Sequence, residues 1–158
     1  MKPPPTEKSY HIFYQMMAGL SPEERSQLGL DGYSIQDLMY LNVGDTRQDQ
    51  ASDSQRFSEF RASLGVLGIP FMDVVRVLSA ILLLGNVEFA PRLGNHEDSF
   101  DIDIIGKDEL NTVARLLGIS TTLLWQGITT RTHSMRGQPV KSMSDANLVR
   151  AKNNNYVT

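Results

Sequence analysis

The chain has 158 residues, the size of one ordinary domain, and 41% of them are hydrophobic, which is enough to form a core. Its formal charge is -3, whereas a protein that binds nucleic acid is usually basic. There is no cysteine, which excludes disulfides, thiolate metal ligands and a cysteine nucleophile, and fits a reducing compartment. No apolar segment typical of a signal peptide follows the first residues, and the most apolar run, residues 77–84, is too short for a membrane span of about 20 residues.

Two short helices are predicted at the start of the chain. The apolar spacing indicates a helix that opens at Thr6 and runs through Met17, with Gly19 as its C-cap. Ser21 is an N-cap for a second helix, because a proline and two glutamates follow it directly. This helix is expected to stop near Gly29.

A polar stretch then separates these helices from a longer one. Residues 43–54 predict a surface loop, and Asp53 or Ser54 is expected to cap the next helix. The break at residues 68–70, Gly-Ile-Pro, ends that helix. Its apolar positions recur every three or four residues: Phe57, Phe60, Leu64 and Leu67.

The helix predicted over residues 71–84 is the most apolar of the chain and is expected to be buried on nearly every side. After it, alternating apolar and charged residues predict a small antiparallel hairpin across residues 91–99. Two more helices are expected, one over 107–117 that ends at Gly118, and one capped by Ser120. Residues 129–141 indicate either a loop or a hairpin, and residues 143–150 a last helix.

Familiar catalytic and metal-binding motifs are absent. The Gly106-Lys107 pair is not a phosphate-binding loop, because Asp101 stands where the first glycine should be and Asp108 where the hydroxyl should be. The three histidines are far apart in sequence, which argues against a metal site. By its chemistry alone, the chain is a mainly helical domain with a small β-hairpin and without catalytic residues.

Two segments carry a resemblance to a known family. Residues 7–15, EKSYHIFYQ, resemble a segment of the myosin motor domain, and residues 78–89, LSAILLLGNVEF, resemble a second one, with Leu83 where histidine is usual. Residues 40–42, 57–69 and 110–119 are similar to further family segments, in the same order. The resemblance covers roughly residues 6–150, and residues 151–158 diverge from the family pattern.

The resemblance implies that residues 1–158 are part of the upper 50-kDa subdomain of the larger α/β P-loop motor domain, where they form a wall of the actin-binding cleft. The complete motor would be an actin-activated ATPase that uses ATP and Mg²⁺ and lies on the cytoplasmic actin cytoskeleton. Its expected partners are F-actin and the remainder of the heavy chain, with no nucleic acid and no membrane span. Because the P-loop, switch I and switch II are missing, this fragment alone is expected to be inactive.

The same resemblance places residues 130–141 at an actin-contacting loop. Arg131, Arg136 and Lys141 are the candidate contacts, because a local excess of positive charge would steer binding to an acidic surface. Ser134 is a candidate regulatory phosphosite, although the divergence after Arg150 leaves the position open between it and its neighbours.

Two alternatives stay open at this point. The chain could be a helical interaction module or truncated product without motor activity, and residues 130–141 could be a solvated hairpin tip. A nucleic-acid-binding role for the basic segment is disfavoured by the acidic overall balance and by the lack of interleaved aromatic residues.

Overall fold

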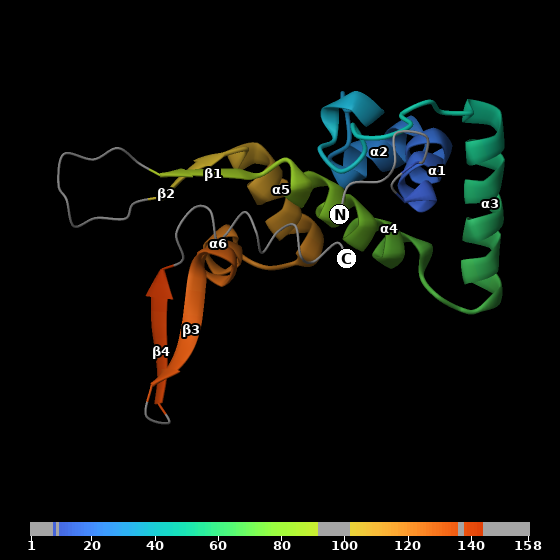
Figure 1. Ribbon diagram of the computed structural model, residues 1–158. Helices are drawn as coiled ribbons and strands as arrows, with labels where there is room; N and C mark the ends of the chain where they lie inside the picture. Colours follow the sequence, from blue (N-terminus) through green and yellow to red (C-terminus); the bar gives the residue numbers. More distant parts are fainter. Residues whose placement is uncertain (1–7, 9, 92–101, 136–137, 144–158) are drawn as a thin grey trace. The chain divides into compact units, whose positions relative to one another are not determined.

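The computed structural model describes residues 8, 10–91, 102–135 and 138–143 (Figure 1). The chain divides into two compact units, Met1–Leu83 and Leu84–Thr158. The first unit holds helices α1 to α3 and most of α4, and the second holds two hairpins and helices α5 and α6. The prediction of a mainly helical fold with a small hairpin is therefore confirmed.

The first two helices are α1 (His11–Gly19) and α2 (Pro22–Leu28). The expected opening of α1 at Thr6 lies outside the described residues, and the helix begins at His11. Ser21 caps α2 through the predicted capping box, and Gly29 ends it in the left-handed conformation with φ 69°.

The prediction that Gly19 is the C-cap of α1 was wrong. Gly19 is the last residue of α1, and the extended Leu20 is the cap. A Cβ atom at Gly19 would lie 2.5 Å from Cδ1 and 2.7 Å from Cβ of Phe57. The absence of a side chain at Gly19 therefore allows α1 and α3 to pack closely.

Helix α3 (Gln50–Val66) starts earlier than the sequence suggested. Its N-cap is Asp49, whose side chain accepts a hydrogen bond from the Ser52 amide, and not Asp53 or Ser54. Asp53 lies inside the helix and is only 5% exposed, so the predicted surface loop ends before it. Before α3 lies the short 3-10 helix η1 (Ile35–Asp37), capped by Ser34.

The apolar stripe of α3 is shorter than predicted. Phe57 and Leu64 are buried and Phe60 is half-buried, but Leu67, beyond the end of the helix, is 70% exposed. Phe57 packs edge-on against Phe71, with ring centroids 5.6 Å apart, which ties α3 to the start of α4 (Phe71–Gly85). Helix α4 buries Val75, Leu82 and Leu83, whereas Val77 is 51% exposed, so it is not covered on every side.

The core of the first unit lies between α1 and α3, beside the segments that follow α2. Large side chains fill it completely, and the Tyr14 hydroxyl, which is buried, donates a 2.9 Å hydrogen bond to the carbonyl of Leu41. The fully buried residues include Tyr14, Met16, Leu28, Leu30, Leu38, Leu41 and Phe57.

In the second unit, β1 (Glu88–Pro91) pairs antiparallel with β2 (Ile102–Ile105), as predicted. Helix α5 (Lys107–Leu117) ends at Gly118, which has φ 69°, and α6 (Thr121–Thr129) is capped by Ser120. The segment predicted as a loop or hairpin contains two paired antiparallel strands, β3 (Thr130–Met135) and β4 (Gln138–Met143). Met143 belongs to β4, and the rest of the predicted last helix lies outside the described residues.

Candidate functional site

Two of the three basic positions singled out in the sequence, Arg131 and Lys141, fall on the paired strands β3 and β4. Arg131 pairs with Ser142, and Lys141 pairs with Thr132 in the next position of the ladder. Ser134, the candidate modification position, pairs with Pro139. Arg136 lies outside the described residues. The structure thus brings the backbone positions of Arg131 and Lys141 together on neighbouring strands.

The base of this hairpin is fixed to helix α6. Thr129 is the last residue of α6 and Thr130 the first of β3, so the helix runs directly into the strand (Figure 1). Thr129 is 2% exposed, and its hydroxyl donates a 2.7 Å hydrogen bond to the carbonyl of Trp125. A buried, hydrogen-bonded residue at this junction sets the direction in which the strand leaves the helix.

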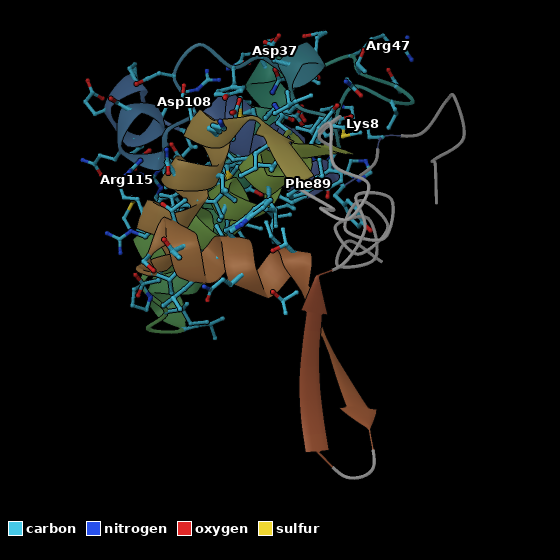
Figure 2. The ribbon with its side chains drawn as sticks, turned by 90° about the vertical axis from the view of Figure 1, so that its left-hand side faces the viewer. Lys8, Asp37, Arg47, Phe89, Asp108 and Arg115 are labelled. Carbon is cyan, nitrogen blue, oxygen red and sulfur yellow. The ribbon has the colours of Figure 1, made fainter. Side chains whose placement is uncertain are left out.

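Helix α6 is in turn held by its neighbours in the second unit. The Trp125 ring stacks on Phe89 of β1 with 5.9 Å between centroids. Thr121 donates a 3.0 Å hydrogen bond to Asn111 of α5. Leu124 of α6 and Val113 of α5 are buried. The hairpin therefore extends from a packed base, as both views show (Figure 1 and Figure 2).

A second feature, which the sequence did not reveal, is a pocket of about 450 Å³ in the first unit. Two glutamines of its wall are hydrogen-bonded to the backbone of α1. The Gln48 side-chain amide donates to the carbonyl of Tyr14 at 2.7 Å, and that of Gln50 donates to the carbonyl of Ala18 at 2.9 Å. Its lining comes from α1, α2, η1 and the residues just before it, the segment before α3 and the first residue of α3, so no single stretch of sequence carries its signature. The lining residues are Met17, Arg25, Tyr33, Ser34, Ile35, Gln36, Thr46, Arg47, Gln48 and Gln50.

Two residues of the lining, Arg47 and Ser34, are bonded to neighbouring carboxylates. Arg47 holds the Asp45 carboxylate through two hydrogen bonds, from Nε at 2.9 Å and from Nη2 at 3.0 Å, and this lowers the pKa of Asp45 to about 2. Asp37 accepts hydrogen bonds from the Ser34 hydroxyl and amide, which lower its pKa as well. Figure 2 shows Asp37 and Arg47 at the outer rim of this unit.

The same unit also holds a largely buried ion pair. Lys8 Nζ is 3.5 Å from Asp53 Oδ2 and 5.0 Å from the centre of the Tyr14 ring. Their side chains are 17% and 7% exposed. Because Asp53 sits where the sequence predicted a helix cap, its role as the partner of Lys8 was missed.

The described residues contain neither a candidate metal cluster nor a candidate membrane span. No three acidic or histidine side chains there come close enough together to hold a metal ion. None of the helices in that part of the chain combines the length and apolarity of a membrane span.

Comparison with known proteins identifies a family. The family model described as "Myosin head (motor domain)" matches residues 1–156. Similar relatives include Myosin-J heavy chain of Dictyostelium discoideum, 39% identical over 71% of this chain, and Myosin IC heavy chain of the same organism, 31% identical over 83%. Unconventional myosin-Ib of Homo sapiens is 30% identical over 90%. The chain spans 5%, 11% and 13% of the lengths of these three relatives.

Proposed function

The chain belongs to the myosin head (motor domain) family, and from this premise we propose that it is part of an actin-based motor that couples ATP hydrolysis to movement. The observation that carries the proposal is the family match over residues 1–156, nearly the whole chain. The partners would be F-actin and the remainder of the heavy chain, at the cytoplasmic actin cytoskeleton. Residues 1–158 would belong to the upper 50-kDa subdomain, as one wall of the actin-binding cleft.

In this proposal, ATP and Mg²⁺ bind elsewhere in the complete motor. Phosphoryl transfer needs a phosphate-binding loop, a metal-holding hydroxyl or carboxylate and a group that positions the water. The sequence of this chain has no such loop. The segment would act mechanically, by moving as part of a subdomain when the cleft closes.

The β3–β4 hairpin would be the actin contact. Arg131, Arg136 and Lys141 would supply a local excess of positive charge that attracts an acidic filament surface. The pairing of β3 with β4 supports this, because it places Arg131 and Lys141 on the same hairpin, in adjacent positions of the ladder. Ser134, on β3, would be the modification position, since a phosphate there would add roughly two negative charges beside these cations.

The test reverses the three cations to glutamate in a motor that carries this segment. Each exposed pair contributes only about 0–1 kcal/mol, so no single position should decide the affinity. Together the three changes should weaken co-sedimentation with actin filaments at low salt and flatten its salt dependence, because charge attraction is screened within roughly 8–10 Å at ordinary ionic strength. ATP turnover without actin should stay the same.

A matched control reverses three exposed arginines elsewhere in the chain, Arg56, Arg76 and Arg115, which changes the net charge by the same amount. Figure 2 shows Arg115 on α5, away from the hairpin. Equal loss of actin binding in both variants would refute the assignment of the contact to the hairpin. Unchanged binding in both would favour the alternative of an interaction module without motor activity.

A further inference from the structure

Arg25 lies in the wall of the 450 Å³ pocket with a charge that no acidic side chain of the described residues neutralises. One of its terminal nitrogens, Nη2, donates a 2.7 Å hydrogen bond to the carbonyl of Tyr33. Its Nε is buried and has no hydrogen-bond partner among the described residues. The adjacent carboxylate, Glu24, is already paired with Arg61 at 2.8 Å. The half-buried guanidinium of Arg25 therefore lacks a counter-ion among the described residues, and an anion bound in the pocket would supply one.

The rest of the lining offers acceptors and an apolar floor. Gln48 and Gln50 use their amide N–H groups on α1, so their side-chain oxygens remain as acceptors that could face a ligand hydroxyl. The Thr46 hydroxyl lies in the same wall. Met17 and Ile35 are 6% and 5% exposed and supply the apolar part. A volume of about 450 Å³ is within the usual range of small-molecule pockets.

We propose that this pocket binds a small organic anion that carries hydroxyl groups, with its anionic group on the guanidinium of Arg25. A carboxylate or phosphate presents two oxygens, which match the two N–H directions of a guanidinium. The hydroxyl groups of the ligand donate to the glutamine oxygens.

The test measures binding of glycerate by NMR chemical-shift titration, with glycerol as the neutral analogue of similar size. The 158-residue chain is used with Val66 and Leu67, two exposed residues outside the pocket, replaced by serine to limit aggregation. Glycerate should perturb the backbone amides around residues 33–36 and 46–50 in a saturable way, and glycerol should not. The Arg25→Gln variant should weaken glycerate binding about tenfold or more, which is the usual effect of losing one charge-assisted hydrogen-bonded contact. The control Arg56→Gln removes an exposed arginine that does not line the pocket and should bind as the unchanged chain does.

Arg25→Lys is a second variant, in case Arg25→Gln does not fold. Lysine keeps the positive charge of the side chain but lacks the paired N–H donors of the guanidinium. It should bind more weakly than the unchanged chain and more strongly than Arg25→Gln. The proposal is overturned if glycerol and glycerate perturb the same amides equally, or if Arg25→Gln and Arg56→Gln bind glycerate alike. Since none of these measurements involves actin or ATP, they succeed or fail independently of the motor function.

Discussion

Replacing Gly19 by alanine is expected to destabilise the first unit, although alanine is normally the better helix former. The added Cβ would lie 2.5 Å from Cδ1, 2.7 Å from Cβ and 2.9 Å from Cγ of Phe57. These distances are about 1 Å shorter than the optimal separation of carbon atoms. The Phe57 ring could rotate away, but its Cβ is fixed to the backbone of α3, so α1 and α3 must move apart.

The expected cost is about 1–3 kcal/mol, the usual range for overpacking of a well-filled core. In urea unfolding followed by circular dichroism, a loss of this size lowers the midpoint by about 1 M. Phe57→Leu in the same chain should not restore the midpoint, because the Cβ of residue 57 remains in place.

Gly65→Ala is the matched control. Gly65 lies within α3 without a positive φ, and a Cβ there would meet no atom within 4 Å. This change should raise the stability by up to about 1 kcal/mol through helix propensity alone. Equal midpoints for Gly19→Ala and Gly65→Ala would refute the inference that Gly19 is needed for the close approach of α1 and α3.

Further predictions follow from the sequence and from single contacts. The 158-residue chain should neither bind nor hydrolyse ATP, and saturable micromolar binding in calorimetry would contradict this. The chain should aggregate readily when expressed alone, because Val66 and Leu67 are 88% and 70% exposed at the turn after α3; replacing both by serine should increase the monomer fraction in size-exclusion chromatography. Arg47→Ala should raise the pKa of Asp45 from about 2 toward its usual 3.8, measurable by NMR titration. Because the pKa of Asp45 is lowered on folding, its stabilising effect should be present above pH 3.8 and disappear as the pH falls through about 2; a pKa unchanged in the variant would exclude Arg47 as the cause. Lys8→Ala should lower the urea midpoint more than Lys8→Arg does, since it leaves the buried Asp53 carboxylate without its cation; equal midpoints would show that the pair contributes nothing.

The features that could be predicted from the sequence depend on contacts within four or five residues. The Ser21 capping box and the left-handed Gly29 and Gly118 are of this kind, because every atom involved lies within one turn of its own helix. The first hairpin also follows from local alternation and was confirmed as β1–β2.

The features that were missed depend on distant residues. Gly19 resembles a helix-ending glycine, and only the approach of Phe57 from α3 shows its other purpose. The sequence predicted Asp53 or Ser54 as the cap of α3, whereas Asp49 caps the helix and Asp53 is buried beside Lys8 from a distant part of the chain. The β3–β4 segment could equally have been a loop, since its alternation does not fix a register.

The competing interpretations of function differ only in what the basic positions do. A motor segment and an interaction module of the same fold would share the packing of α1 on α3, so the Gly19 and Lys8 variants cannot separate them. The charge of the β3–β4 hairpin can, because attraction to a filament depends on the sign and place of the charges and not on the stability of the core. One variant reverses Arg131, Arg136 and Lys141, and the other reverses Arg56, Arg76 and Arg115. The two variants have the same net charge and differ only in where the reversed charges lie. A selective loss of actin binding in the first variant is therefore the result that the motor interpretation requires.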